Sequence, residues 1–483
     1  MQANKLFDFD NSYLALPDRF YSRVKPSSFA HAEIFFLNEK LCDELNVSTK
    51  NPEAFISLFF GDESTKNDET FAQAYAGHQF GYFTKLGDGR AIIIGEHITR
   101  KNKRFDIQLK GSGRTPYSRG GDGKATLRSM LREYLLSEAM YSLNIPSSRS
   151  LAVIKTGEPV SRETIHAGAA LVRIMKSHIR IGTFEYAAHF GSTDDLKALT
   201  TYTIKRLYPE LAHDENPVIS LLSKVMLNQI ELVVNWMRVG FIHGVMNTDN
   251  TSISGESFDY GPCAFMNTYH PDTVFSSIDQ NGRYAFDNQP RIIKWNITRF
   301  AEALLPIIHE NKEKSLKLAQ AVIDAFDKTW NEKYYAAMLG KIGIERNAPE
   351  LCALVDDLLQ LMNEYKMDYT NTFLALSQDI SFEDRPINGP GLKPWLEKWK
   401  DAIEHSNGMH RAKQLMKTYN PIYIPRNHIV EQALDEAVNG ELILFKRLMG
   451  VLSPPYEYRK NFDEFMQPSN SDFERSYQTF CGT

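Results

Sequence analysis

The sequence has few of the features that mark secreted or membrane proteins. Its four cysteines, Cys42, Cys263, Cys352 and Cys481, stand far apart and show neither zinc-site spacing nor a disulfide framework. The longest apolar stretch, residues 219–236, is interrupted by charged and amide side chains, which argues against a membrane span. The N-terminal segment has neither the apolar core of a signal peptide nor the composition of a transit peptide. We therefore expect a cytoplasmic protein without a membrane partner.

An excess of basic residues is also missing. The 483 residues include 55 Lys and Arg against 60 Asp and Glu, which gives a net charge of −5. A dedicated nucleic-acid binder usually shows a basic excess, so we expect no nucleic-acid partner, although a local basic cleft is compatible with this balance. Hydrophobic residues make up 42% of the chain, and its length is sufficient for a large buried core.

Glycine is present in ordinary amount but is unevenly spread. Ten of the 28 glycines lie between Gly77 and Gly123. Short β-branched or apolar runs at 91–94, 105–109 and 151–154 predict strands around this region. Apolar residues at helical spacing predict one helix over 124–143. Strands and glycine loops with a single helix are typical of a small α+β lobe.

Helical patterns dominate the chain after about residue 180. The spacing of apolar residues predicts helices over 194–207, 218–239, 297–308, 313–338, 349–365, 392–404 and 428–440. Residues 241–265 have the pattern of a short hairpin with loops. We therefore expect an α+β protein with a strand-rich lobe over residues 1–165 and an enlarged helical lobe over residues 166–483.

A lysine in the glycine-rich region is a candidate phosphate ligand. Lys110 ends the predicted strand 105–109, and Gly111-Ser112-Gly113 follows, so its charge can reach a phosphate; the alternative is a solvated lysine. The predicted helix offers Glu133 and Glu138 as its partner. The helical wheel places Glu133 at the flank of the apolar stripe and Glu138 nearer its middle, and by itself favours Glu138. Either carboxylate is also compatible with a simple surface salt bridge.

Two glycine turns flank this lysine strand. Gly87-Asp88-Gly89-Arg90 precedes it, and Arg119-Gly120-Gly121-Asp122-Gly123 follows it. The second turn comes just before the predicted helix, so Asp122 is a candidate N-cap, and backbone N–H groups at a helix start form an anion site. Each turn alone is weak evidence, because glycine turns are common.

The most specific pattern is His243-Gly244-Val245-Met246-Asn247-Thr248-Asp249-Asn250, followed by Asp259-Tyr260-Gly261. Asn250 and Asp259, each expected at the end of a short strand, offer oxygen ligands suited to a divalent cation, although such polar residues also favour plain turns. The order of glycine turns, strand lysine, helix glutamate, Asn and Asp-aromatic-Gly is that of the protein kinases. Val245, however, occupies the position of the kinase catalytic Asp and cannot accept a proton; Asp249 is the acid that remains in the loop.

Longer strings carry a family resemblance. YAGHQFGYFTKLGDGRA, QLKGSGRTPYSRGGDGKATLRSMLREYL, HGVMNTDN, DYGP, GRYAFDNQP and NPIYIPRNHIVEQAL together resemble the selenoprotein O family of pseudokinases, over nearly the whole chain. The resemblance implies a protein-kinase-like two-lobed fold. It also implies a protein adenylyltransferase that binds ATP in an orientation flipped relative to kinases. Such an enzyme transfers AMP to Ser, Thr or Tyr hydroxyls of target proteins and releases pyrophosphate.

The same resemblance assigns roles to residues. Lys110 would bind the phosphates and Glu133 would hold Lys110, which settles the choice against Glu138. The other nucleotide-binding residues that it implies are Gly87, Gly89, Arg90, Asp122, Gly123, Arg173 and Arg180. Asp249 matches the proton acceptor. Asn250 and Asp259 match the ligands of Mg²⁺ or Mn²⁺, with Asp259 also near the nucleotide.

Two alternatives to AMP transfer stay open from sequence. One is a conventional phosphotransferase in which Asp249 replaces the missing acid, and the other is a non-catalytic nucleotide-binding scaffold, which Val245 suggests. The nucleotide could also be UTP. We expect a monomer. Family members often end in a cysteine pair or a cysteine–selenocysteine pair, whereas this chain ends in Cys481-Gly482-Thr483; Cys481 is either a redox-sensitive thiol or a tail cysteine without function.

Overall fold

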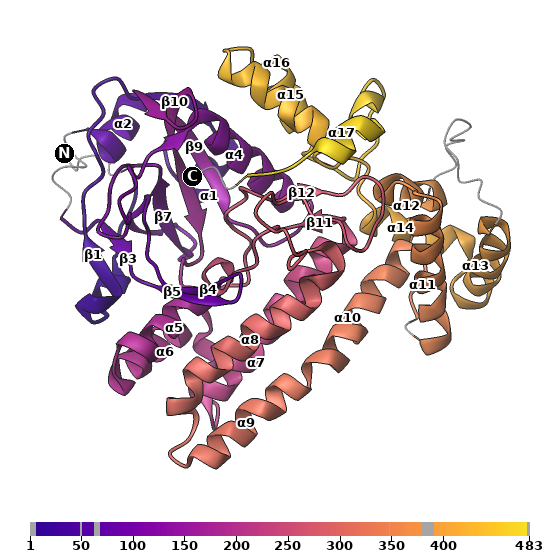
Figure 1. The fold of residues 1–483 in the computed structure, drawn as a ribbon, viewed down its shortest axis with the longest axis horizontal. Coiled ribbons are helices and arrows are strands. Elements are labelled where there is room, and N and C mark those ends of the chain that lie inside the picture. The colour runs from indigo at the N-terminus through magenta and orange to yellow at the C-terminus, as the bar shows by residue number, and fades with distance from the viewer. Residues whose placement is uncertain (1–5, 49–50, 62–67, 347, 378–390, 481–483) are drawn as a thin grey trace.

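An antiparallel sheet organises the first part of the chain (Figure 1). The computed structural model describes residues 6–48, 51–61, 68–346, 348–377 and 391–480. The sheet has the order β1-β3-β6-β7-β10-β9-β2, with β8 paired to β10, and two hairpins, β4–β5 and β11–β12, lie apart from it. The strands are β1 Tyr21–Arg23, β2 Glu33–Leu37, β3 Phe71–Gln73, β4 Ala76–Gln79, β5 Tyr82–Lys85, β6 Ala91–Ile98, β7 Arg104–Lys110, β8 Ala125–Thr126, β9 Arg149–Ser161, β10 Ile165–Met175, β11 Phe241–Ile242 and β12 Ala264–Phe265.

Both faces of the sheet are covered. Side chains of a strand alternate between faces, so Ile92 and Ile94 of β6 belong to one buried cluster and Ile93 to another. The first cluster includes apolar residues of α1 (Glu39–Leu45) and α2 (Pro52–Phe60). The second includes α4 (Leu127–Ser142) and continues without a break into the helical part of the protein.

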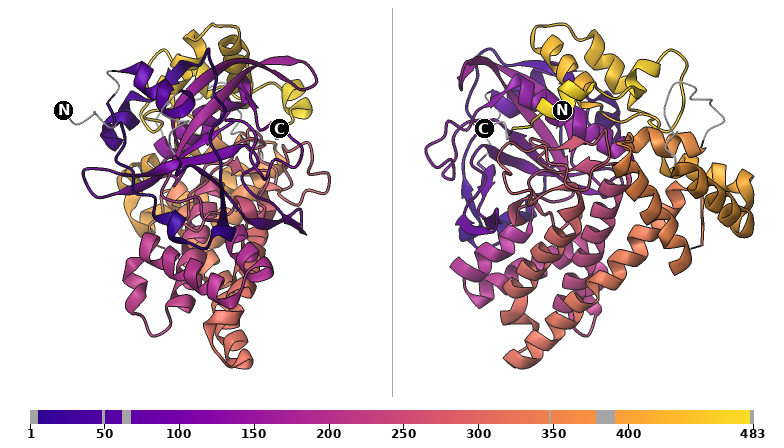
Figure 2. Two further views of the ribbon diagram at one scale, coloured as in Figure 1. Left: turned by 90° about the vertical axis from the view of Figure 1, so that its left-hand side faces the viewer. Right: turned by 45° about the vertical axis from the view of Figure 1, so that its right-hand side comes forward.

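Helices make up most of the remaining chain and extend away from the sheet (Figures 1 and 2). They are α5 Ile181–Phe190, α6 Thr193–Leu207, α7 Pro217–Arg238, α8 Gln289–Ile308, α9 Lys312–Asp324, α10 Phe326–Lys341, α11 Pro349–Glu364, α12 Tyr369–Ser377, α13 Leu392–Ser406, α14 Gly408–Tyr419, α15 Asn427–Val438, α16 Ile443–Val451 and α17 Ser471–Ser476. The α+β expectation is therefore confirmed.

Helix α7 alone, among the described helices, is long and apolar enough to cross a membrane. Half of its apolar window is buried inside the protein, where α7 packs against α8 and α10. A core helix of a globular protein passes the same test of length and composition. The packing therefore accounts for the apolar character of α7 without a membrane.

Most predicted elements are confirmed, and four local expectations were wrong. The helix predicted over 297–308 begins eight residues earlier, at Gln289. The single helix predicted over 313–338 is two helices that meet at Ala325, because α9 packs mainly on α8 whereas α10 packs mainly on α7. The helix predicted from 124 starts at Leu127, because residues 125–126 pair with β10 and the Thr126 side chain caps the helix. Asn250 and Asp259 lie in the connection between β11 and β12 rather than each at a strand end. Cys481 lies outside the described residues.

Candidate active site

Four charged side chains meet at the end of β7. Lys110 is the last residue of β7, and its Nζ donates to Oε2 of Glu133 on α4 at 2.7 Å and to Oδ1 of Asp259 at 2.5 Å. Arg173 on β10 donates to Glu133 from Nε at 2.9 Å and to Asp259 Oδ1 from Nη2. Arg173 stands opposite Gln108 in the neighbouring strand, so it shares the face of Lys110 two residues away. We call Lys110, Glu133, Arg173 and Asp259 the lysine cluster.

The lysine cluster balances its own charge. Burial alone would raise the pKa of both carboxyls, but Arg173 and Lys110 outweigh it, so the pKa of Glu133 is lowered and that of Asp259 lies well below its usual range. The side chain of Asp259 is 28% exposed, against 8% or less for the other three. Asp259 is therefore the member that a ligand can reach.

Glu138, which the helical wheel favours, is occupied elsewhere. Its carboxylate pairs with Arg149 at 2.8 Å and accepts hydrogen bonds from the side chain of Asn38 and the backbone of Ser150. The wheel indicates which face of α4 is buried, but it does not distinguish two buried glutamates with different partners.

A further buried arginine lies beside the lysine cluster. Arg180 stands at the start of α5, and its guanidinium lies 4.0 Å from the centroid of the Tyr75 ring. Its Nη2 contacts Asp88 Oδ1 at 3.5 Å, and its Nη1 donates to the backbone oxygen of Asp249 at 3.3 Å. Sequence reasoning did not single out Asp88. An acidic residue between two glycines was the pattern that could have marked it as a site residue. Arg180 thus joins the first glycine turn to the loop that carries Asp249.

The loop after β11 is fixed by its own backbone contacts. The ring Nε2 of His243 contacts the backbone oxygen of Phe258 at 3.0 Å, which connects this loop to the residue before Asp259. Val245 is buried, and its backbone oxygen accepts from Nδ2 of Asn250 at 3.1 Å. Because the amide nitrogen of Asn250 is used in this way, its Oδ1 is directed away from Val245.

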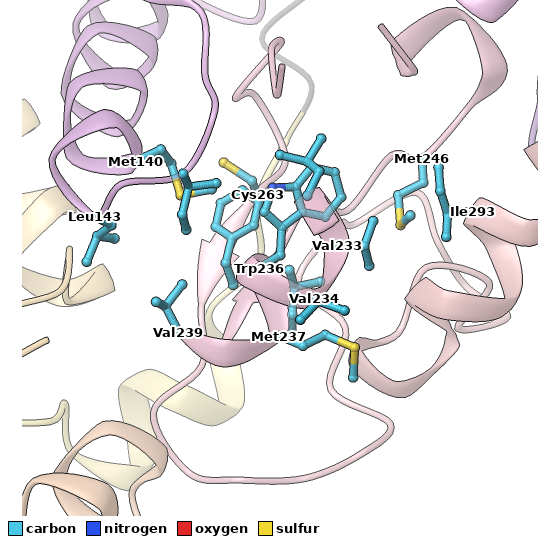
Figure 3. Close-up of a cluster of buried hydrophobic side chains, with 14 of the residues drawn as sticks. Met140, Leu143, Val233, Val234, Trp236, Met237, Val239, Met246, Cys263 and Ile293 are labelled. Carbon is cyan, nitrogen blue, oxygen red and sulfur yellow. The ribbon is translucent and has the colours of Figure 1, made fainter. Parts of the chain in front are cut away.

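A cluster of buried apolar side chains packs against this loop (Figure 3). Trp236 near the end of α7 stacks on His243 with ring centroids 5.2 Å apart, and its Nε1 donates to Ser257 Oγ at 2.7 Å. Met246 of the loop and Ile293 of α8 belong to the same buried cluster. The loop therefore rests on packed side chains from two long helices, which limits its freedom.

Asp249 has the environment expected of a proton acceptor. The residue is 6% exposed, and its Oδ1 has no hydrogen-bond partner in the described part of the chain. Its Oδ2 accepts from Nε2 of Gln79 at 3.4 Å. Burial raises the pKa of Asp249 to about 6, although Arg180 opposes the rise. Such a carboxylate is ionised at neutral pH and is a better base than an exposed one.

The β4–β5 hairpin holds this loop residue by residue. The backbone N–H of His78 donates to Thr248 Oγ1 at 2.7 Å, and that of Phe80 donates to Asn247 Oδ1 at 3.1 Å. Gln79, between them, is the residue that contacts Asp249. Three successive hairpin residues thus contact three successive loop residues about 170 positions later. Sequence reasoning did not find this hairpin contact.

Two glycines permit the close approach of the hairpin and the loop. A Cβ added at Gly77 would lie 2.8 Å from Asp249 Oδ1 and 2.9 Å from its Cβ. A Cβ added at Gly182 on α5 would lie 2.0 Å from the backbone oxygen of Ala76. Real Cβ atoms do not approach so closely, so a side chain at either position must displace the hairpin or Asp249.

We expect Gly77→Ala to lower the catalytic rate by about 10- to 100-fold, because displacing the carboxylate of Asp249 by about 1 Å reduces the rate by that factor. ATP affinity should change little, since the methyl group presses on Asp249 and not on the lysine cluster. Turnover and nucleotide affinity measured separately check this. Gly450→Ala on α16, where a methyl group meets nothing within 4 Å, is the control. An unchanged rate in Gly77→Ala would contradict the close contact with Asp249.

A buried carboxyl anchors the other side of the hairpin. Glu185 on α5 accepts from Thr248 Oγ1 and lies 2.5 Å from the Nδ1 of His78. Burial raises the pKa of Glu185 to about 7, and burial also lowers the pKa of His78. Both shifts favour a neutral pair in which the protonated carboxyl donates a hydrogen bond to the Nδ1 of the neutral imidazole.

This pair predicts a pH dependence of stability. The unfolded glutamate has its ordinary pKa of 4.5, whereas the folded one is near 7, so the folded state binds more protons between these values. The contribution of Glu185 to the free energy of unfolding should therefore fall as pH rises from about 4.5 through 7, by up to about 3 kcal/mol, while the lowered pKa of His78 contributes a rise of opposite sign. In Glu185→Gln the amide keeps both contacts without titrating, and this part of the fall should disappear. Denaturant unfolding from pH 5 to 8 tests it; parallel profiles of the two proteins would refute it.

The first glycine turn is attached to the end of β7. Gly87 has a φ of +148°, and a Cβ there would lie 2.3 Å from the Tyr117 ring. Gly89 lies in the same turn, and the backbone oxygen of Arg90 accepts from Gly111 N at 2.7 Å, which attaches this turn to the end of β7. The first turn therefore adjoins the lysine cluster.

The second turn is joined to the loop that follows β7, because Gly113 N donates to the backbone oxygen of Gly123 at 3.1 Å. Gly123 has a φ of +69°, and a Cβ there would lie 1.9 Å from the Gly113 backbone oxygen. Asp122 pairs with Arg162 at 2.8 Å and accepts from the backbone of Lys124, so the expectation that it caps α4 was wrong. Within the described residues, no hydrogen bond or ion pair joins Asp122 to the lysine cluster.

Metal binding at this site depends on oxygen donors. No group of three or more His, Cys, Asp or Glu side chains in the described ranges is arranged to hold a metal. Asn250 Oδ1 and Asp259 provide an amide and a carboxylate oxygen, and Asp259 uses Oδ1 alone for its two cations. Mg²⁺ is usually bound by only a few protein oxygens, and substrate phosphates fill its remaining coordination positions. These residues therefore fit a cation that arrives with a nucleotide.

Comparison with known proteins decides the family. The family model described as "Protein adenylyltransferase SelO" matches residues 4–453. The chain belongs to the SelO family. Proteins named "Protein nucleotidyltransferase YdiU" are similar to this SelO-family chain over its whole length. The one from Bacillus thuringiensis is 48% identical over 482 residues, covering 99% of this chain and 98% of the relative.

Relatives from distant bacteria agree. The protein of the same name from Pelagibacter ubique is 48% identical over 478 residues, covering 98% of this chain and 99% of the relative. That from Anoxybacillus flavithermus is 49% identical over 488 residues and covers both chains fully. The SelO-family resemblance noted from sequence is thus confirmed, and the protein is a nucleotidyltransferase.

Proposed function

We propose that the protein transfers AMP from ATP to Ser, Thr or Tyr hydroxyls of target proteins. The observation that carries the proposal is Asp249, a buried carboxylate with a free Oδ1 in a loop where Val245 replaces the acid of kinases. Lys110 and Arg173 contact Asp259, and Arg180 contacts the backbone of Asp249, so these buried cations would neutralise a triphosphate once a metal engages Asp259.

The mechanism assigns each group one task. Asp249 accepts the proton of the target hydroxyl while that oxygen forms a bond to the α-phosphorus. The bond from the α-phosphorus to the bridging oxygen breaks, and pyrophosphate leaves with its electron pair. Lys110, Arg173 and Arg180 stabilise the charge that accumulates on the pyrophosphate. Asn250 and Asp259 would hold Mg²⁺ or Mn²⁺, which would supply Lewis-acid neutralisation of the phosphate charge.

Assignments that follow the family complete this proposal. Gly87, Gly89 and Arg90 would contact nucleotide from the turn next to Gly111, and Asp122 and Gly123 would do so from the second turn. We also propose a kinase-like arrangement of two lobes, over residues 1–165 and 166–483. Strand β10 (Ile165–Met175) belongs to the sheet, so the sheet extends past this boundary to Met175. The enzyme would act as a monomer in the cytoplasm, on proteins and not on nucleic acid or membranes.

Mass spectrometry tests the function. The protein is incubated with ATP and Mg²⁺, alone and with a bacterial lysate, and modified proteins are identified. Adenylyl adducts are expected. Phosphate adducts would instead indicate a phosphotransferase that uses Asp249, and ATP binding without any adduct would indicate a scaffold. A parallel incubation with UTP establishes whether uridylyl transfer occurs as well.

A further inference from the structure

A cleft of about 860 Å³ adjoins the tip of the β4–β5 hairpin. Phe80 and Tyr82 line it from the hairpin, and the segment from Ile278 to the first turns of α8 lines it from the other side. In Figure 1 the hairpin lies between the sheet and helices α5 and α8. The mechanism proposed above does not use this cleft.

The lining of the cleft is positively charged. Arg283, Arg291 and Lys294 contribute cations, and Asp279 is the one acid among the lining residues. Both carboxylate oxygens of Asp279 accept backbone N–H groups, from Arg283 at 2.9 Å and Tyr284 at 2.8 Å. In the described ranges neither Arg283 nor Arg291 forms an ion pair, and Lys294 pairs with an exposed carboxylate of Asp327 at 2.6 Å.

One of these cations is held in a defined orientation. The guanidinium of Arg283 lies 5.0 Å from the centroid of the Trp295 ring and 5.7 Å from that of Tyr284. A Cβ at Gly81, the hairpin tip, would lie 3.7 Å from the guanidinium carbon and both terminal nitrogens. The planar group is therefore enclosed between an aromatic ring and the hairpin, which lowers the entropy lost when it binds a carboxylate.

The cleft is joined to the loop that carries Asp249. Tyr284 follows Arg283 and donates to Asn247 Oδ1 at 2.5 Å, and the same oxygen accepts from Phe80 N. Asn247 lies two residues before Asp249. Burial raises the pKa of the Tyr284 hydroxyl to about 12, although Arg283 opposes the rise.

We propose that this cleft binds an acidic stretch of the protein substrate next to the hydroxyl that receives the nucleotide. The charge of the lining selects carboxylates, and the exposed Tyr82 and Ile278 offer apolar contacts at the rim. The proposal rests on the proposed function, because it names the class of protein on which that site acts. A basic segment would be repelled by the three cations.

Synthetic polymers of opposite charge provide the probe. A fluorescent random copolymer of glutamate and tyrosine offers hydroxyls beside carboxylates, and one of lysine and tyrosine offers the same hydroxyls beside cations. We expect the purified full-length protein to bind the acidic copolymer, measured by fluorescence anisotropy, and not the basic one. Arg291→Glu and Lys294→Glu reverse two cleft charges, and each should weaken binding by about tenfold or more. Lys317→Glu on the exposed face of α9 makes the same charge change outside the cleft and should leave binding unaltered.

Transfer is measured on the same samples with ATP labelled at the α-phosphate. The acidic copolymer should be labelled, with a KM raised in Arg291→Glu and Lys294→Glu. Equal binding of both copolymers, or binding that is unchanged in both cleft variants, would overturn the proposal. If binding is charge-selective but no protein or polymer is labelled, the proposed function is overturned. The proposal that the cleft binds acidic segments then still stands.

Discussion

Asp249→Asn is expected to lower nucleotide transfer by about 10²–10⁴-fold, the usual contribution of a positioned general base. Asparagine keeps the shape of the side chain and can still contact Gln79, but it cannot accept a proton from the target hydroxyl. The cations that bind phosphate are unaffected. The rate should therefore fall while the affinity for ATP stays close to that of the original protein. Single-turnover rates and equilibrium nucleotide binding, measured separately, distinguish the two effects.

Glu256→Gln is the matched control for this prediction. Glu256 is also a buried carboxyl, seven residues further along the same connection, and accepts from Ser254 Oγ at 2.7 Å and from the backbone of Lys176 at 3.1 Å. An amide can accept both bonds, so transfer should persist in this variant. If ATP affinity falls in Asp249→Asn as much as the rate does, Asp249 is a binding residue and the assignment as base is wrong.

The second large effect is expected at Glu133. In Glu133→Gln, Lys110 and Arg173 retain Asp259 as their one carboxylate in the lysine cluster, which leaves a net positive charge in a buried place. Removing one partner of a buried ion pair costs about 3–5 kcal/mol of stability. Transfer should also be strongly reduced, because both cations then compete with the metal for Asp259, and a tighter hold on Asp259 leaves them less available to the phosphates. Urea unfolding and transfer assays on the same preparation measure the two effects.

Glu138→Gln separates stability from catalysis. Glu138 lies on the same helix and is also buried against an arginine, but Arg149 belongs to no part of the proposed site. We expect some loss of stability in Glu138→Gln with transfer retained. Equal losses of transfer in the two variants would mean that the effect of Glu133 arises from weakened folding alone.

The parts of the fold that depend on local pattern were predictable. The three strand predictions fall within β6, β7 and β9, and Lys110 does end its strand, because alternation and β-branched residues are local signals. The break at Ala325 carries no glycine or proline. It depends on which neighbouring helix each segment packs against, and this information is not contained in the spacing of apolar residues.

The candidate site was predictable only where single residues carry their own chemistry. Asp249, Asp259 and Lys110 stand out by type and position. The residues that position them do not, because their partners lie far along the chain. Gln79 looks like an ordinary polar residue until Asp249 is found beside it, and Asp122 looks like a helix cap until Arg162 pairs with it across 40 positions.

The contact between the β4–β5 hairpin and the loop 247–249 has a mechanical consequence. Any rotation that carried the hairpin away from the loop would break three hydrogen bonds together. The residue that receives the proton would lose its orientation in the same movement. Pyrophosphate and the modified protein therefore leave most easily by a motion that keeps this contact closed and bends the chain elsewhere, so that Asp249 is already oriented when the next cycle begins.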